Sequence, residues 1–441
     1  MSTTSFSTIR EHPSENSIFI VGGGIVGAAL AYYLSKDIRK DDRNLQVVVL
    51  DKSLGFLLGS TTYAPGFVGQ YNQSPVETRL AMDSVREYST IPDGFSAVGG
   101  MELASTEPGV ERLKKRCSSA KAAGLPAEII TAEKASALAP DFVKTETIRA
   151  GLHFPSDGTA NGGTIASYFR QKAAEYGACF VEVAVKGFET KDNGEIRAIS
   201  TSEGPLNIHS TDSVILATGL WTQFLLKDAL SQKPITKSPI PIVPIGHPYT
   251  FTSSRPARKG PPYPFVRWPE YHVYARDHGT HDGMGAYNHR PIPITDPVGS
   301  AVGTWSASFE TALAEAARTC LKNGERFLTV DGCTDEDVTT SSKRKPFNGI
   351  FSVTPDNLPM AGRVKDCGNL WLCAAVWITH AAGTAKLIAQ DILRTTDSEV
   401  SADDAALLMA LDPNRFLGRG MEELTRMALG RYNDIYNSQP L

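Results

Sequence analysis

The sequence lacks the features that mark several specialised classes of protein. Its 441 residues carry 44 basic and 48 acidic side chains, so no excess of charge points to nucleic acid or to an anionic membrane surface. No apolar run approaches the ~20 residues that span a bilayer, and residues 1–17 lack the apolar segment of a secretory signal. We therefore expect a soluble, cytoplasmic protein with small-molecule partners and with neither nucleic-acid nor membrane partners.

Cysteine is scarce and follows no pattern of a disulfide framework or a zinc site. No C-x-x-C spacing occurs, so we expect reduced thiols. Four histidines fall close together in one predicted hairpin, but no carboxylate or cysteine stands beside them at ligand spacing. We predict polar hairpin positions for these histidines and no metal site. The residues concerned are Cys117, Cys179, Cys320, Cys333, Cys367 and Cys373, and His272, His278, His281 and His289.

The most informative stretch joins a predicted strand, a glycine turn and a helix. Residues 18–21 are apolar, and Gly22, Gly24 and Gly27 follow them in the pattern G-x-G-x-x-G. In this pattern the first glycine permits the turn, the second lets the backbone approach a pyrophosphate, and the third lets helix and strand touch. A second predicted strand ends in Asp51, an acid suited to a ribose hydroxyl. This context favours a dinucleotide site over an ordinary glycine-rich turn.

The remaining elements are predicted from periodicity and from turn residues. With 41% hydrophobic residues, the chain can bury one large core or two medium ones, and we expect two interleaved domains. We expect Pro241, Pro244 and Pro248 to break any long element around them. The pattern predicts strands at 99–104, 179–185, 213–216, 348–359 and 370–378, a hairpin of 271–276 with 284–290, and helices at 76–88, 107–123, 129–138, 163–176, 308–320 and 383–393.

Four motifs, in order along the chain, resemble the flavin domain of the dimethylglycine oxidase and sarcosine dehydrogenase family, which belongs to the D-amino-acid-oxidase-like flavoproteins. The motifs are GSTTYAPG at 59–66, GAYNHRP at 285–291, FSVTPD at 351–356 and AVWITH at 375–380. The resemblance covers nearly the whole chain from Ser17. It implies FAD as the cofactor and an α/β (α+β) fold, in which a Rossmann-like FAD-binding domain is interleaved with a substrate domain built on an antiparallel sheet.

The residues at the two ends predict a disordered N-terminus over 1–17 and a C-terminal helical extension, in one or two surface helices, over 401–441. Between them, the resemblance implies how the chain divides. The FAD-binding domain is expected over 18–90, 151–232 and 345–400, and the substrate domain over 91–150 and 233–344.

Carried over position by position, the resemblance implies a set of FAD contacts. Residues after the first strand would hold the pyrophosphate, those after the second strand the adenosine, and two later loops the flavin ring. Ala217 and Gly219 follow a strand that commonly lies against the dinucleotide, although alone it equally fits a buried strand ending in a glycine turn. The predicted contacts are Gly22, Gly24, Ile25, Val26, Gly27, Asp51, Lys52, Ser60, Thr61, Thr62, Tyr63, Phe67, Val185, Ala217, Gly219, Trp377, Ile378, Thr379 and His380.

For catalysis, the resemblance points to His247 and Tyr274. His247 could accept the proton of a substrate ammonium, and Tyr274 could hydrogen-bond the nitrogen or a carboxylate. From the residues alone, a histidine among prolines is more often a turn residue, and a strand tyrosine more often a packing residue. Four arginines are candidates for a substrate carboxylate, and the sequence does not rank them. They are Arg267, Arg276, Arg290 and Arg363.

The implied reaction is oxidation of a secondary or tertiary amine, in particular an N-methylated amino acid, to an iminium that hydrolyses to aldehyde and demethylated amine. Either O2 or an electron-transfer protein would reoxidise the flavin. Relatives commonly tether FAD to a histidine where this chain has Tyr63, so we predict non-covalent FAD. The segment 432–436 resembles the linker before a folate-binding domain, so formaldehyde would be released to solvent. The alternatives are oxidation of a larger N-methyl amine in secondary metabolism and a non-catalytic FAD-binding protein.

Overall fold

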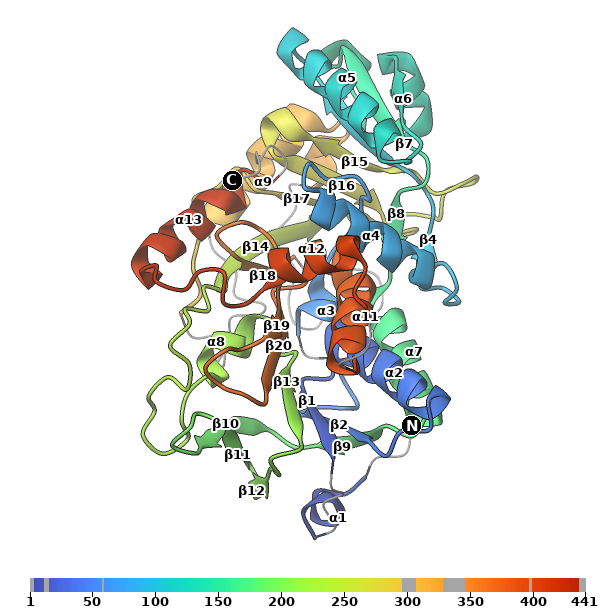
Figure 1. The fold of residues 1–441 in the computed structure, drawn as a ribbon. Helices are drawn as coiled ribbons and strands as arrows, with labels where there is room; N and C mark the ends of the chain where they lie inside the picture. Colours follow the sequence, from blue (N-terminus) through green and yellow to red (C-terminus); the bar gives the residue numbers. More distant parts are fainter. Residues whose placement is uncertain are drawn as a thin grey trace.

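The computed structural model of the protein describes residues 4–11, 16–57, 59–295, 307–327, 346–395 and 399–435. Two large sheets organise these residues, one mostly parallel and one mixed (Figure 1). Together they confirm the predicted fold class, an α/β protein with parallel and antiparallel sheets. The predicted domain boundaries stay a prediction. Parts of the predicted domains, and Cys333, lie outside the described residues. These parts are 1–3, 12–15, 58, 296–306, 328–345, 396–398 and 436–441.

The first sheet contains the predicted nucleotide strand at its centre. Its order is β19-β20-β13-β1-β2-β9, with all neighbours parallel except β19 and β20. Its strands are β1 (Ser17–Val21), β2 (Gln46–Asp51), β9 (Cys179–Glu182), β13 (Ser213–Leu216), β19 (Met360–Arg363) and β20 (Leu370–Ala374).

Helices cover one face of this sheet and a small antiparallel sheet covers the other. The helices on the first face are α2 (Ile25–Lys40), α7 (Gly162–Glu175) and α11 (Ala381–Ile392), with α4 (Pro75–Tyr88) packed on α11. The sheet on the second face is formed by β10 (Val185–Thr190), β11 (Ile196–Thr201) and β12 (Gly204–Asn207). Both faces are covered, so β1 is buried along its whole length, and it is apolar from Ile18 to Val21.

The second large sheet has eight strands in the order β18-β14-β17-β16-β15-β5-β7-β6. They are β5 (Gly100–Ala104), β6 (Glu128–Ile130), β7 (Ala150–Phe154), β14 (Val243–Phe251), β15 (Phe265–Trp268), β16 (Val273–Asp277), β17 (Asp282–Ala286) and β18 (Phe347–Val353). The predicted hairpin is present as β16 and β17.

The other helices and strands are short or lie at the margins of the sheets. A three-stranded sheet is formed by β3 (Phe67–Val68), β8 (Gly158–Ala160) and β4 (Phe95–Ser96). The remaining helices are α1 (Phe6–Glu11), α3 (Ser60–Tyr63), α5 (Glu107–Ala122), α6 (Ala132–Leu138), α8 (Thr222–Leu225), α9 (Ala307–Cys320), α12 (Ala402–Leu411) and α13 (Met421–Asn433), with 3-10 turns η1 (Thr145–Thr147), η2 (Gly219–Trp221), η3 (Pro269–Tyr271), η4 (Gly324–Phe327) and η5 (Ile378–His380).

Two expectations are wrong. Part of the N-terminus is ordered, because Phe6 and Ile9 of α1 are buried in the core beside β10–β12 and the Thr4 N–H donates to the Phe180 carbonyl at 2.9 Å. The prolines also fail to break β14, which runs for nine residues. Pro244 lies on the strand edge that faces Ile294, whose N–H donates to its carbonyl, so its missing N–H costs no bond to β18.

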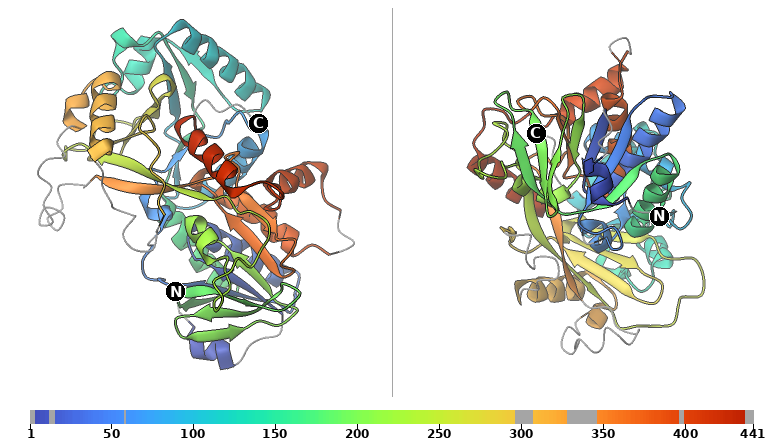
Figure 2. Two further views of the ribbon diagram at one scale, coloured as in Figure 1. Left: turned by 90° about the vertical axis from the view of Figure 1, so that its left-hand side faces the viewer. Right: turned by 90° about the horizontal axis from the view of Figure 1, so that it is seen from below.

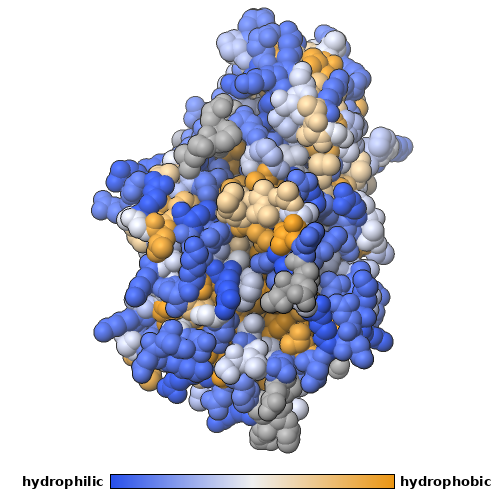
Figure 3. Space-filling view, in the orientation of Figure 1, coloured by the Kyte–Doolittle hydropathy of each residue, from blue (hydrophilic) through white to orange (hydrophobic). Residues whose placement is uncertain are grey.

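The two C-terminal helices differ in how deeply they are buried. α13 lies against β14 and β18, and its Leu424, Ala428 and Tyr432 are fully buried (Figures 1 and 2). α12 presents apolar surface, with Met409 75% exposed, on the face drawn in Figure 3. Among the described residues, no helix combines the length and hydropathy needed to cross a membrane.

Candidate active site

The start of α2 has the geometry of a phosphate site. Gly22 has φ +99°, and a Cβ on Gly27 would overlap the Gly22 carbonyl, so both positions require glycine. The helix begins after Gly24 without a side-chain cap. Its first N–H, on Ile25, donates to the Thr61 hydroxyl of a neighbouring loop at 3.2 Å. A glycine turn at a helix start without a side-chain cap of its own suits a pyrophosphate, which is the group that the glycine pattern predicted.

The residues predicted for adenosine lie around this turn. The Asp51 carboxylate accepts the Gly23 N–H at 2.6 Å, and the Asp51 carbonyl accepts the Val183 N–H at 2.8 Å, which brings the chain leading to Val185 beside it. The Lys52 ammonium lies 5.1 Å from the centre of the Trp221 ring. Two further predicted contacts frame the turn: the carbonyl of Ala217 would lie 2.7 Å from a Cβ on Gly22, and Gly219 has φ +54°.

The loops predicted for the flavin ring are joined by hydrogen bonds over long sequence separations. The Thr379 hydroxyl donates to the Phe67 carbonyl at 3.1 Å. The Tyr88 hydroxyl of α4 donates to the Ile378 carbonyl at 2.7 Å, and the Trp377 indole N–H donates to the Ser352 carbonyl at 3.1 Å. These bonds fix the 377–380 turn beside β3.

The 59–66 motif is fixed to the second large sheet. Its Ser60 hydroxyl donates to the Ile350 carbonyl of β18 at 3.1 Å, and the Tyr63 ring lies edge-on to Phe347 at 5.6 Å. Thr62 donates to the Leu57 carbonyl at 2.7 Å, within the same loop. The end of β2 and the 59–66 motif both adjoin the glycine turn, through Gly23 and Ile25, so the predicted adenosine and flavin segments meet at the predicted pyrophosphate and the residues present fit FAD.

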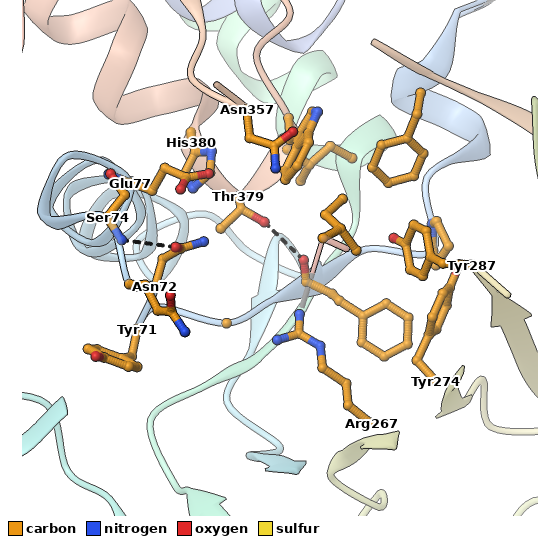
Figure 4. Close-up of a pocket in the computed structure, with 18 of the residues that line it drawn as sticks. Tyr71, Asn72, Ser74, Glu77, Arg267, Tyr274, Tyr287, Asn357, Thr379 and His380 are labelled. Atoms are coloured by element: carbon orange, nitrogen blue, oxygen red, sulfur yellow. Dashed lines mark hydrogen bonds between the residues drawn. The ribbon is translucent and has the colours of Figure 1, made fainter. Parts of the chain in front are cut away.

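A cavity of about 190 Å³ lies against the 377–380 turn (Figure 4). One wall is polar, with Glu77 and Asn357 near His380, and the Arg267 side chain reaches toward the middle. Aromatic rings line the rest of the cavity, from Trp377, which stacks on His380 at 6.1 Å, to Tyr274 on the far side, with neighbouring ring centres 4.7 to 5.9 Å apart. Such a surface suits N-alkylated cations. The rings of this aromatic wall are Phe67, Tyr274, Tyr287, Phe351 and Trp377.

A buried row of hydrogen-bonded side chains ends at this wall, and its proton positions can be assigned from one end. The Nδ1 of His289 lies 2.9 Å from the Arg290 carbonyl, which can only accept, so this nitrogen carries the proton. Burial lowers the pKa of His289 and keeps the ring neutral, so its Nε2 is an acceptor. The Tyr432 hydroxyl therefore donates to it at 2.8 Å and shares the same proton with the Gly246 carbonyl at 3.2 Å.

The same reasoning continues toward the cavity. Since Tyr432 has donated its proton, its oxygen accepts Nδ1–H of His247 at 2.8 Å. Burial, followed by His289, lowers the pKa of His247 well below its ordinary value, so the Nε2 of this neutral ring accepts the Tyr274 hydroxyl at 2.5 Å. The Tyr274 hydroxyl thus donates its proton to His247, so toward any further group its oxygen can act only as an acceptor.

His247 does not lie in the cavity, as the expectation of direct contact with the amine required. Its side chain is 2% exposed and is stacked behind Tyr274 at 5.7 Å between ring centres, and the cavity is lined by Tyr274. The structure therefore brings the two predicted catalytic residues together, but places only the phenol where a substrate can touch it.

Two glycines on β17 make room for this arrangement. A Cβ on Gly285 would overlap the Tyr274 hydroxyl, and one on Gly283 would overlap that of Tyr249. The phenol of Tyr274 therefore crosses the neighbouring strand only because that strand carries no side chain there.

The four arginines that are candidates for binding a substrate carboxylate differ in their position relative to the cavity. Arg267 lines the cavity, whereas Arg276 donates to the Pro65 carbonyl and lines a different cavity beside Thr61. Arg290 and Arg363 are exposed, and Arg363 donates to the Gly368 carbonyl at 2.8 Å. The geometry therefore favours Arg267 for a substrate carboxylate.

Sequence reasoning missed three residues of the site. It placed His289 among the polar hairpin residues and Tyr432 in a linker, and it did not single out Glu77. For Tyr432, the helical spacing with Leu424 and Ala428 was a signal of burial, although not of its partners. His380 was predicted as a flavin neighbour, and it lines the cavity, with burial lowering its pKa to about 4.

The glycine turn, the joined loops and the cavity together define a dinucleotide-binding flavoprotein. Residues 17–391 match the model of the FAD dependent oxidoreductase (DAO) family, so the chain belongs to that family. The resemblance seen in the motifs is therefore confirmed, and the family supports FAD as the cofactor.

Individual relatives agree with this family. Mitochondrial dimethylglycine dehydrogenase of Mus musculus is 25% identical over 414 residues, which cover 90% of this chain and 44% of the relative. This chain thus spans less than half the length of that relative. Among solved structures, L-proline dehydrogenase from P. horikoshii has a TM-score of 0.72 at 23% identity, covering 92% of this chain and 98% of the other. Glycine oxidase from Geobacillus kaustophilus has a TM-score of 0.67 at 20% identity, covering 91% and 100%. These likenesses show a shared fold.

Proposed function

We propose that this protein binds FAD without a covalent bond and oxidises a secondary or tertiary amine, in particular an N-methylated amino acid. The observation that carries the proposal is the position of Tyr274. Its phenol, oriented by buried His247, faces the same cavity as the 377–380 turn. FAD, when bound, would accept the equivalent of a hydride from the carbon beside the nitrogen.

The protein's own part is to hold a neutral amine and to remove its proton. An ammonium in the cavity donates its N–H to the Tyr274 oxygen, which accepts because its own proton is held by Nε2 of His247. Since burial disfavours a positive charge on His247 and on His289, the row does not keep the substrate's proton, which is released to water before the C–H bond breaks. The nitrogen is then neutral, and its lone pair can stabilise the iminium. Water hydrolyses this product to aldehyde and demethylated amine.

The rest of the cavity suits an N-methylated amino acid. The aromatic wall offers ring faces to the N-methyl groups, and Arg267 offers a guanidinium to the carboxylate. The Arg267 guanidinium lies 3.9 Å from Glu102, whose two oxygens accept closer bonds from Arg116 at 2.8 and 3.0 Å. Arg267 lines the cavity, and this position supports it as the partner of a substrate carboxylate.

Product analysis tests the reaction. The FAD-loaded protein is incubated with secondary and tertiary N-methyl amino acids, and hydrogen peroxide and formaldehyde are measured. We expect formaldehyde in proportion to amine consumed. Peroxide would identify O2 as the acceptor, and dye reduction without peroxide would identify an electron-transfer protein. If no compound yields aldehyde or reduces a dye, the proposal is wrong, and the result would support a non-catalytic FAD-binding role instead.

The attachment of FAD has a separate test. We expect acid precipitation to leave a colourless pellet and a yellow supernatant, since Tyr63 replaces the histidine tether of relatives. Yellow colour retained in the pellet would show a covalent bond.

A further inference from the structure

Glu77 is the third residue of α4, and its carboxyl takes no part in capping the start of that helix. The Ser74 hydroxyl caps the helix by accepting the Glu77 N–H at 3.4 Å. In such a Ser-x-x-Glu sequence the glutamate commonly returns the bond by accepting the serine N–H. Here that N–H donates to the Asn72 side chain at 3.1 Å instead. The Glu77 carboxyl is left to line the cavity, near His380 (Figure 4).

This carboxyl is buried without a compensating charge. Glu77 is 5% exposed, and its Oε1 has no hydrogen-bond partner. Among the described residues, no lysine or arginine pairs with it: Arg116 pairs with Glu102, and Arg415 pairs with Asp356 through bonds of 2.8 and 3.0 Å. Burial, followed by Asp356, raises the pKa of Glu77 to about 8.

A protein gains nothing from burying such a group unless a partner reaches it. A metal ion does not fit, because the described residues contain no group of three or more potential metal ligands. Tyr274 lies on the far side of the cavity, so the nitrogen held there is not the partner of Glu77 (Figure 4). The missing partner is therefore a second group on the same ligand.

We propose that Glu77 binds an ammonium or guanidinium group that the substrate carries in addition to the amine being oxidised. The proposal rests on the amine oxidation proposed above and narrows its substrate class. With the carboxylate at Arg267, the amine at Tyr274 and the second cation at Glu77, the cavity fits an N-methylated amino acid with a basic side chain. Glu77 acts as a specificity-determining residue and takes no part in the proton transfer.

A pair of substrates that differ in one group tests this. Nα-methyllysine and N-methyl-2-aminoheptanoic acid have side chains of equal length, and a methyl in the second replaces the ammonium of the first. For the FAD-loaded wild type we expect a higher kcat/KM with Nα-methyllysine. In Glu77→Gln we expect this advantage to fall by roughly ten- to hundredfold, the value of a hydrogen bond to a charged group, with the neutral substrate little changed.

The matched control is Glu133→Gln, which changes an exposed glutamate in the first turn of α6 and should behave as wild type. A wild type without preference for the basic substrate, or a Glu77→Gln variant that keeps the preference, overturns the proposal. A loss of bound FAD or a changed flavin spectrum in ligand-free Glu77→Gln also overturns it, because Glu77 would then contact the cofactor.

Measurements of ligand binding can test the role of Glu77 independently of the proposed oxidation. If neither compound is oxidised, the proposed function fails, and the affinities of both compounds are measured by calorimetry on the same proteins. Tighter binding of Nα-methyllysine to wild type, lost in Glu77→Gln, would still support the role of Glu77. Equal or absent binding of the two compounds would overturn it.

Discussion

Tyr274 connects the cavity to a row of buried side chains, and its hydroxyl is the atom that a substrate nitrogen would meet. We predict that Tyr274→Phe slows reduction of the bound flavin by roughly 10² to 10⁴, the range of general acid-base catalysis, without lowering FAD content. Stopped-flow spectroscopy would measure the rate.

Tyr249→Phe is the control for that variant. Tyr249 is also buried on the eight-stranded sheet, but its hydroxyl lies 2.8 Å from His278 and it does not line the cavity. Equal rates for the two variants would remove Tyr274 from the reaction.

Glu77 makes stability depend on pH, and the sign follows from its raised pKa. The folded protein holds a proton on Glu77 up to about pH 8, whereas an unfolded glutamate releases it near 4.5. As pH rises from 4.5 through 8, wild type therefore loses stability that Glu77→Gln keeps. We expect the variant's advantage in Tm to grow between pH 5 and pH 9. A difference in Tm that is constant over this range would show that Glu77 is not a buried acid.

At the scale of elements, α13 matters because it supplies Tyr432 to the centre of the hydrogen-bonded row. Tyr432→Phe removes the acceptor of Nδ1–H of His247 and the donor to His289. We predict a kcat lowered by about tenfold, the value of one or two lost hydrogen bonds, with a changed pH profile of flavin reduction and a nearly unchanged KM. A purely structural role would lower Tm but leave the pH profile as in wild type.

Gly285 of β17 leaves room for the Tyr274 phenol because it has no side chain. Gly285→Ala would push the Tyr274 ring off its position, so we predict a loss of flavin reduction with FAD retained, by about 10² for a displacement on the order of 1 Å. Gly55→Ala is the control, because its Cβ would meet no atom within 4 Å. Full activity of Gly285→Ala would show that the phenol need not cross β17.

Local sequence patterns predicted most of the helices and strands. They failed where a segment's structure depends on contacts with residues far away in the chain. The glycine turn, α4, α5 and the β16–β17 hairpin follow from periodicity and turn residues in their own segments. The course of β14 does not, because a proline is tolerated there only on the edge facing Ile294. Likewise, the order of α1 depends on Phe6 meeting a core formed by later strands.

In the candidate site, too, contiguous motifs could be recognised from the sequence, whereas contacts between distant residues could not. Motifs at 59–66 and 375–380 indicated the flavin loops, because each motif is contiguous in sequence. The row from Tyr274 to His289 joins β14, β16 and α13, whose residues lie up to 185 positions apart. No local spacing could reveal that His247 lies behind Tyr274, nor that an acid on α4 would face the cavity without a partner.

For the whole molecule, the two large sheets place the two halves of the proposed chemistry side by side. The parallel sheet and the start of α2 would hold the dinucleotide, and the eight-stranded sheet provides Tyr274 and Arg267. The hydrogen bond from Thr379 to the Phe67 carbonyl joins the loops predicted to contact the flavin. The account therefore requires that a bound flavin and a bound amine meet in one cavity.

Anaerobic mixing of the FAD-loaded protein with N-methyl amino acids, Nα-methyllysine among them, tests this requirement most directly. We predict that the absorbance of oxidised flavin disappears on mixing and returns when an electron acceptor is admitted. Flavin that binds in full amount but stays oxidised with every amine of the panel would contradict the account.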